Sequence, residues 1–229
     1  MPHRRYPQRI PQRAPQLPAA LTGPLVDGHA LLMDSVPAHP FRVVIAPGNG
    51  CEGPIDRCIW YGWLKRELGK QGIPCTTAMF PDPILAREEY WLPFLAGPLG
   101  CDERTVLVGH SSGAAAALRL LETTRLAGAV IVSACHSDLG DPVERASGYF
   151  NRPWDWAAIR RHATHFLMQF HGADDPFVPV EEGRAVSRWL QCEYHESPTA
   201  GHYQATFQRE LLRLLAEKMR GLAATVPPP

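Results

Sequence analysis

The chain has 229 residues and equal numbers of basic and acidic side chains, 23 Lys and Arg against 23 Asp and Glu. This length fits one domain better than two, and the balanced charge gives no field that would draw the chain to nucleic acid or a membrane surface. No apolar run reaches the roughly 20 residues that a membrane-spanning helix needs. The 6 cysteines are scattered without a Cys-x-x-Cys pair, which predicts no disulfide framework, no metal site and a reducing compartment. We expect no cofactor, and a location in the cytoplasm, with the nucleus as a second location.

Residues 1–40 are predicted to be an extension that precedes the domain. Their first half is rich in proline and arginine, and prolines at this spacing prevent a helix. The segment lacks the apolar core of a secretory signal, and without an amphipathic helix it does not fit a mitochondrial transit peptide. We expect a disordered or weakly ordered extension, then one domain over residues 41–223 and a short tail over residues 224–229.

From residue 41 onward, short apolar runs alternate with stretches of helical character. Residues 41–46 are the first predicted buried strand, and Pro47-Gly48-Asn49-Gly50 is the turn-rich loop after it. The other predicted strands are residues 75–80, 106–108, 128–134, 165–170 and 192–196, and the predicted helices are residues 56–70, 84–95, 114–121, 154–161, 181–190 and 205–219. Residues 137–156 interrupt the alternation as a long polar loop with many aromatic residues, which is typical of a functional loop.

This alternation predicts an α/β fold with three layers. A mostly parallel sheet of about six strands should carry helices on both faces, because strand–helix–strand units place their helices over the sheet. Ligands of such sheets bind beyond the carboxyl ends of the strands. Residues that directly follow predicted strands are therefore the first candidates for a functional site.

The stretch from residue 105 to residue 113 carries the strongest functional signal. A β-branched run ends at Gly109 and a helix-forming run starts after Gly113, so the pattern Gly-x-Ser-x-Gly lies between a strand and a helix. This is the arrangement of a nucleophile elbow, a tight turn that lifts a serine hydroxyl out of the backbone. The pattern predicts that Ser111 is a nucleophile.

A serine hydroxyl needs a base that accepts its proton, and the base needs a carboxylate that fixes its tautomer. In folds with this elbow the chain order is serine, acid, histidine. His202 follows the last predicted strand and is the predicted base. Of two adjacent acids we favour Asp175 over Asp174, because Gly172, Asp175 and the following Val-Pro match a pattern that is frequent at this loop.

Acyl transfer also needs backbone N–H groups that stabilise the oxyanion. Ser112, the residue after the nucleophile, should supply one, and Asn49 or Gly50 in the loop after the first strand should supply the second. The Gly-x-Gly of that loop lacks the further glycine of a dinucleotide fingerprint and the Lys-Ser/Thr of a P-loop. A nucleotide-binding or hydride-transfer enzyme is therefore disfavoured.

From about residue 41 to the C-terminus, the chain resembles the retinoblastoma-binding protein 9 family of small serine hydrolases, which have the α/β-hydrolase fold. The matching stretches are Pro47-Gly48-Asn49-Gly50, Trp60-Tyr61-Gly62-Trp63, Pro81-Asp82-Pro83, Ala86-Arg87-Glu88, Trp91-Leu92-Pro93-Phe94, Gly109-His110-Ser111-Ser112-Gly113, Ser137-Asp138-Leu139-Gly140-Asp141, Glu144-Arg145-Ala146-Ser147-Gly148-Tyr149-Phe150, Arg152-Pro153-Trp154, Asp174-Asp175-Pro176-Phe177 and Gly201-His202. The resemblance implies a triad of Ser111, Asp175 and His202. It implies a serine hydrolase that cleaves a small ester or amide through an acyl-enzyme. Residues 1–40 and 51–59 depart from the family pattern.

A second hypothesis comes from the family name. Leu99, Cys101 and Glu103 form the pattern Leu-x-Cys-x-Glu, a short motif that docks into retinoblastoma-type pocket proteins. Three fixed residues often occur by chance, and docking needs an extended, exposed segment. The alternative is an interaction protein that binds a pocket protein through this motif and keeps a vestigial hydrolase site.

Overall fold

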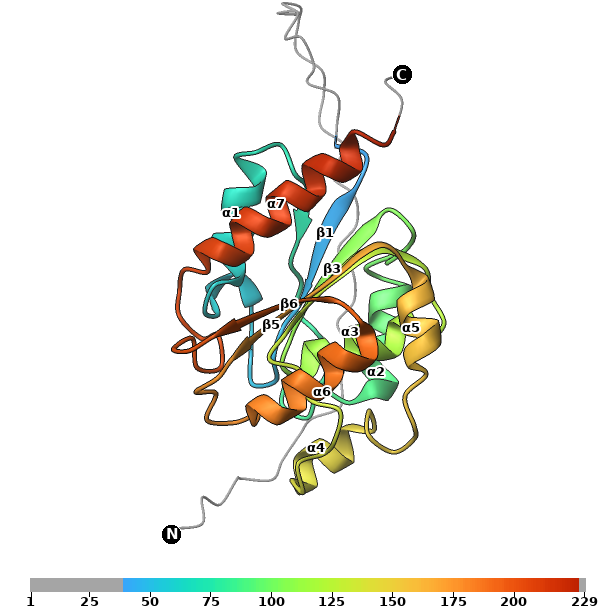
Figure 1. The fold of residues 1–229 in the computed structure, drawn as a ribbon, viewed down its shortest axis with the longest axis vertical. Helices are drawn as coiled ribbons and strands as arrows, with labels where there is room; N and C mark the ends of the chain where they lie inside the picture. The colour runs from blue at the N-terminus through green and yellow to red at the C-terminus, as the bar shows by residue number, and fades with distance from the viewer. Residues whose placement is uncertain (1–38, 227–229) are drawn as a thin grey trace, which may run out of the picture. The chain divides into compact units, whose positions relative to one another are not determined.

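The computed structural model describes residues 39–226, so the predictions for residues 1–38 and 227–229 lie outside the described residues (Figure 1). Within them, one sheet has the strand order β2-β1-β3-β4-β5-β6, and all neighbouring strands are parallel. The strands are β1 (Arg42–Ala46), β2 (Cys75–Thr76), β3 (Thr105–His110), β4 (Leu126–Val132), β5 (Ala163–Gly172) and β6 (Glu193–Ser197). The predicted α/β fold with a parallel sheet is confirmed.

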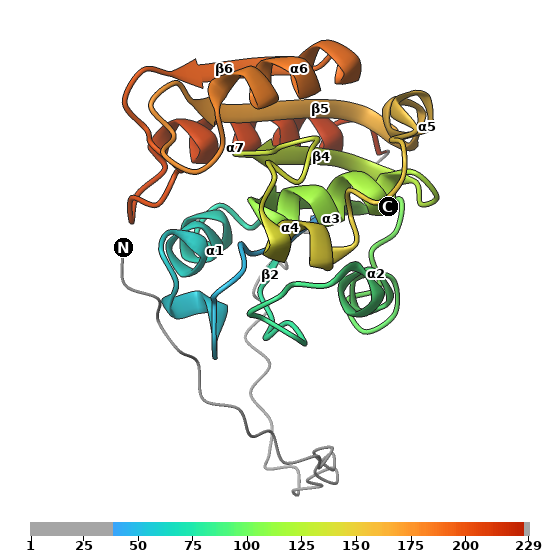
Figure 2. The same ribbon diagram turned by 90° about the horizontal axis from the view of Figure 1, so that it is seen from below.

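Helices cover both faces of this sheet (Figures 1 and 2). One face packs against α1 (Tyr61–Gly69) and α7 (Arg209–Ala223), and the other packs against α2 (Glu88–Ala96), α3 (Ser112–Leu121), α5 (Trp156–His162) and α6 (Val180–Leu190). Successive side chains of a strand point to opposite faces, so Val106 and Val108 belong to the first core and Leu107 to the second. The central strands β3 and β4 are buried along their whole length, as expected for a sheet that is covered on both sides.

The helix α3 lies unusually close to the strands at the elbow. A Cβ atom on Gly113 would lie 2.2 Å from the carbonyl oxygen of Ala46, and one on Gly109 would lie 2.3 Å from the carbonyl oxygen of Gly113. Only glycine fits at these two positions, because any side chain would collide with backbone. The elbow glycines therefore let the end of β1, the end of β3 and the start of α3 meet.

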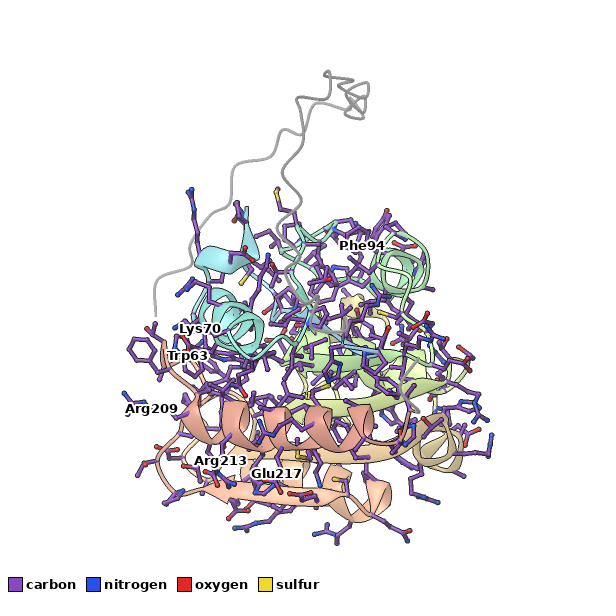
Figure 3. The ribbon with its side chains drawn as sticks, turned by 90° about the horizontal axis from the view of Figure 1, so that it is seen from above. Trp63, Lys70, Phe94, Arg209, Arg213 and Glu217 are labelled. Carbon is purple, nitrogen blue, oxygen red and sulfur yellow. The ribbon has the colours of Figure 1, made fainter. Side chains whose placement is uncertain are left out.

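The outer face of α7 points away from the sheet and carries charged residues (Figure 3). Arg213 Nη1 lies 3.6 Å from Glu217 Oε2, and both side chains are exposed, so the pair contributes little stability. Trp63 of α1 meets Phe207 edge-on, with ring centroids 5.7 Å apart. This contact ties α1 to the segment that leads into α7.

Three predicted elements are shorter than expected. The strand predicted over residues 75–80 ends at Thr76, because only Cys75 and Thr76 pair with β1. The helix predicted over residues 56–70 is a short 3-10 turn (Ile55–Arg57) followed by α1, because Ile59 has a left-handed φ of 35° that interrupts the helix. The helix predicted from residue 84 starts at Glu88, since Ala86 also has a positive φ.

The predicted loop over residues 137–156 contains one further helix, α4 (Pro142–Ser147). Asp141 caps this helix, because its Oδ1 accepts a hydrogen bond from the Val143 amide at 2.6 Å. Pro142 occupies the first helical position, where the missing N–H of proline costs nothing. The predicted loop is therefore a structured segment with a capped helix.

Candidate active site

The candidate site lies at the carboxyl ends of the strands. The chain runs from β1 to its neighbour β2 and then crosses to β3 on the other side of β1. A reversal of this kind is the switch point at which α/β sheets bind ligands. The loop after β1 and the elbow after β3 meet there, because a Cβ atom on Gly48 would lie 3.3 Å from Ser111 Cβ.

Ser111 occupies a backbone conformation that L-residues rarely adopt. Its φ is 55° and its ψ is −119°, and the surrounding hydrogen bonds hold this geometry. The Ser111 amide donates to the Val132 carbonyl at 2.9 Å, and the Ser111 carbonyl accepts from the Ala114 amide at 2.8 Å. Strain of this kind persists only where the fold enforces it, and it is the geometry of a nucleophile elbow.

His202 and Asp175 form a buried pair. His202 Nδ1 lies 2.8 Å from Asp175 Oδ2 and 3.0 Å from Oδ1, and the Asp175 side chain is 0% exposed. Burial raises the pKa of Asp175, but hydrogen bonds from His202, Val178 N and Phe177 N outweigh it and lower the pKa to about 2. Asp175 is therefore a carboxylate at neutral pH that accepts the Nδ1–H of His202, which leaves Nε2 free to accept a proton.

The neighbouring Asp174 has a different partner. Its Oδ1 accepts a hydrogen bond from the Gly201 amide at 2.7 Å, and the residue is exposed. This bond holds the backbone just before His202 and does not reach the imidazole ring. Of the two acids, only Asp175 is hydrogen-bonded to the imidazole ring of His202.

Ser111 and His202 line one cavity of about 420 Å³. Among the side-chain hydrogen bonds of residues 39–226, none joins Ser111 Oγ to His202 Nε2; such bonds often tighten only when substrate binds. The lining residues come from the loops at the carboxyl edge and from the connection between β4 and β5. They are Asn49, Ser111, Ser112, Ala115, Ser133, Cys135, Leu139, Asp141, Glu144, Phe150, Phe177, Val178, His202 and Gln204.

The charged groups of this cavity are acidic. Asp141 and Glu144 line it, and no lysine or arginine does among the described residues. Burial, and then the nearby Asp141, raise the pKa of Glu144. Asp141 and Glu144 therefore place two carboxyl groups at the wall of the cavity.

The predicted oxyanion donors have different surroundings. Ser112 begins α3, where a helix leaves its first N–H groups without an intrahelical acceptor. The Gly50 amide already donates to the Pro83 carbonyl at 2.7 Å, which removes Gly50 from the candidates. The Asn49 amide has no such partner within residues 39–226, and Asn49 lines the cavity together with Ser112.

The segment with the Leu-x-Cys-x-Glu pattern lies at the opposite end of β3. Leu99 is 8% exposed and Cys101 is 5% exposed, and both belong to the core beside α2 and α3. Burial raises the pKa of the Cys101 thiol to about 12. Of the three fixed residues of the motif only Glu103 is exposed, so the folded chain does not present the extended motif that docking requires.

Sequence reasoning did not select Asp141, Glu144 or Tyr61 as parts of the site. The Asp-Pro pair at residues 141–142 is a helix-start signal that could have placed Glu144 in the first turn of a helix. Tyr61 lies beneath the site, where its Oη is hydrogen-bonded to Gly48 N and His110 Nδ1. It carries no comparable signal, because these partners belong to other elements. Within residues 39–226, no helix is long and apolar enough to cross a membrane, and no group of three or more His, Cys, Asp or Glu could hold a metal ion.

Comparisons with known proteins place the chain among hydrolases. The serine hydrolase family matches residues 43–210. The serine hydrolase RBBP9 of Rattus norvegicus is 45% identical over 179 residues, which cover 78% of this chain and 95% of that protein. The solved structure of the ydeN gene product from B. subtilis is 24% identical with a TM-score of 0.70, over 79% of this chain and 99% of the other. A carboxylesterase structure from Nitrososphaera gargenis is 10% identical with a TM-score of 0.61, over 82% and 92%. The chain belongs to the serine hydrolase family and has the α/β-hydrolase fold.

Proposed function

We propose that this hydrolase cleaves a small ester or amide through an acyl-enzyme, with Ser111 as nucleophile, His202 as base and Asp175 as the acid that orients the base. One observation carries the proposal. The Nδ1 atom of His202 lies within hydrogen-bond distance of both carboxylate oxygens of Asp175, and His202 and Ser111 line the same cavity. This is the arrangement that activates a serine hydroxyl.

The chemistry proceeds in two halves. Ser111 Oγ attacks the substrate carbonyl and its proton passes to His202 Nε2, while Asp175 stabilises the imidazolium. The backbone N–H groups of Ser112 and Asn49 stabilise the oxyanion, and collapse expels an alcohol or amine that takes the proton from His202. Water then attacks the acyl group, with His202 as base again, and releases the acid and free Ser111.

The cavity constrains the substrate. A volume of about 420 Å³ lies in the lower part of the roughly 300–1,000 Å³ range of small-molecule sites. Ala115, Phe150 and Val178 give it apolar walls, and Asp141 and Glu144 give it negative charge. These walls suit a small substrate with an apolar group and no negative charge.

A fluorophosphonate probe tests the nucleophile directly. We expect wild-type labelling at Ser111, located by mass spectrometry of the labelled peptide, and no labelling of Ser111→Ala. Ser133→Ala is the matched control, because Ser133 also lines the cavity and its buried hydroxyl has no hydrogen-bond partner in the described residues. Persistent labelling of Ser111→Ala would refute the proposal. Paired p-nitrophenyl ester and 4-nitroanilide substrates then distinguish ester from amide preference.

A further inference from the structure

A buried chain of hydrogen bonds runs beneath the candidate site and joins two of its loops. The Gly48 amide lies 2.8 Å from Tyr61 Oη, and Tyr61 Oη lies 2.7 Å from His110 Nδ1. His110 Nε2 lies 2.8 Å from the carbonyl oxygen of His202. Tyr61 and His110 are 1% and 3% exposed, so water does not compete for these bonds.

The two ends of the chain fix the direction of every bond. The Gly48 amide can only donate, so Tyr61 Oη accepts there and its own hydrogen is left for His110 Nδ1. His110 then carries its proton on Nε2 and donates it to the His202 carbonyl, which can only accept. Burial, and then the nearby His202, lower the pKa of His110 to about 3, so the ring is neutral at neutral pH.

Both ends reach groups that the proposed reaction uses. Gly48 precedes Asn49, the proposed oxyanion donor, and the other end is the peptide of His202 itself. Trp60 holds the next peptide of the same loop, because its Nε1–H donates to the Tyr203 carbonyl at 2.7 Å. Tyr203 has a φ of 51°, a conformation that persists only where the surroundings enforce it.

We propose that Tyr61 and His110 are positioning residues of the hydrolase site. Through one directed chain of hydrogen bonds they fix the Asn49 amide and the His202 ring relative to Ser111. This inference rests on the proposed function. Neither side chain hydrogen-bonds Ser111 Oγ or His202 Nε2. Both bond backbone groups of the two loops, and the His110 ring also packs against the His202 ring, with centroids 5.0 Å apart. Catalytic groups need this support, because small displacements of a reacting group lower the rate steeply.

The main test removes the hydroxyl of Tyr61 and keeps its ring. Tyr61→Phe leaves the Gly48 N–H and His110 Nδ1 without a partner, so the loops that carry Asn49 and His202 are no longer held in position relative to each other. We expect kcat for a p-nitrophenyl ester to fall about 10- to 100-fold, with KM nearly unchanged because the walls of the substrate cavity stay intact. Tyr149→Phe is the matched control, because Tyr149 is also fully buried and its Oη has no partner in the described residues.

A conservative pair of variants at His110 gives a second readout. His110→Gln can still accept from Tyr61 and donate to the His202 carbonyl through its amide, whereas His110→Leu can do neither. We expect His110→Gln to retain a larger share of kcat than His110→Leu in samples whose thermal melting shows that both fold. Equal kcat in the two variants would overturn the proposal, as would a Tyr61→Phe variant with the kcat of Tyr149→Phe.

Imidazole ¹⁵N resonances of the full-length wild type test the chain of bonds without any activity measurement. We expect His110 in the neutral form with its proton on Nε2. A proton on Nδ1, or a charged ring at neutral pH, overturns the inference even if Tyr61→Phe fails to fold. Failure of the proposed function is visible separately, because the fluorophosphonate probe would then leave Ser111 unlabelled.

Discussion

The two short motifs of this chain lie at the two ends of strand β3. The motif at the amino end is mostly buried, whereas the motif at the carboxyl end opens onto a cavity. At the amino end, residues 99–103 place Leu99 and Cys101 in the core and expose Glu103. At the carboxyl end, residues 109–113 place Ser111 at a cavity under backbone strain. Strand direction, which a motif pattern does not contain, therefore decides which motif is available for chemistry.

The physical reason is the asymmetry of a parallel sheet. At the carboxyl edge helices begin, so their free N–H groups and partial positive charge are available to an anion, as at the start of α3. At the amino edge helices end and the chain packs against its own core before it enters the next strand. We therefore expect changes at the carboxyl end to alter catalysis and changes at the amino end to alter stability alone.

The largest expected effect is on the buried pair at the carboxyl edge. Asp175→Asn should lower kcat by about 10⁴-fold, because an amide can hold His202 in the wrong tautomer. Asp174→Asn is the matched control, since Asp174 bonds only the Gly201 amide within the described residues. Steady-state kinetics with a p-nitrophenyl ester measures both, and an equal loss in the two variants would contradict the assignment of Asp175.

At the amino end, Leu99→Ala should destabilise the fold without changing the chemistry. Removing this buried side chain should cost about 2–5 kcal/mol of unfolding free energy. Urea denaturation measures the loss, and kcat per folded molecule should equal that of the wild type. A lower kcat in fully folded protein would break the separation between the two ends of β3.

Acid should lower the free energy of unfolding through His110, which lies at the carboxyl end of β3. Unfolded His110 takes up a proton near its ordinary pKa of 6.5, whereas the folded ring resists protonation down to about pH 3. The stability that this ring contributes is thus complete above pH 6.5 and is lost as pH falls toward 3, by about 2 kcal/mol at pH 5. Urea denaturation at pH 7 and pH 5 should show a smaller loss in His110→Gln than in the wild type. Equal losses would refute this source of acid sensitivity.

The smallest expected effect is at the exposed acid of the amino-end motif. Glu103→Ala should change the unfolding free energy by less than about 0.5 kcal/mol, as is usual for a surface substitution. We also expect no capture of a retinoblastoma-type pocket protein by the folded chain, with or without this substitution, because Leu99 and Cys101 are buried. Capture by the wild type that Glu103→Ala abolishes would show that the motif becomes exposed.

Much of the fold follows from the sequence, because a parallel sheet that is covered on both faces leaves continuous apolar runs between helical stretches. The candidate site follows for a related reason, since Ser111, Asp175 and His202 each lie in the connection that follows a predicted strand. The resemblance to a serine hydrolase family is confirmed by the 45% identity to RBBP9.

The remaining features depend on contacts between distant residues. The strand at Cys75 is short because pairing with β1 ends there, and no local pattern records where pairing stops. The Gly50 amide could be excluded as an oxyanion donor only after its bond to Pro83 was known. The same holds for Tyr61, whose partners Gly48 and His110 lie in other elements.

A large part of the cavity wall comes from a connection of the chain that carries none of the groups proposed to react. The connection between β4 and β5 contributes Cys135, Leu139, Asp141, Glu144 and Phe150 to the wall, whereas the groups proposed to react follow β3, β5 and β6. This connection is anchored independently, because Glu182 of α6 accepts hydrogen bonds from the amides of His136 and Ser137. Substitutions within residues 137–150 should therefore change this part of the wall and leave the proposed reacting groups in place.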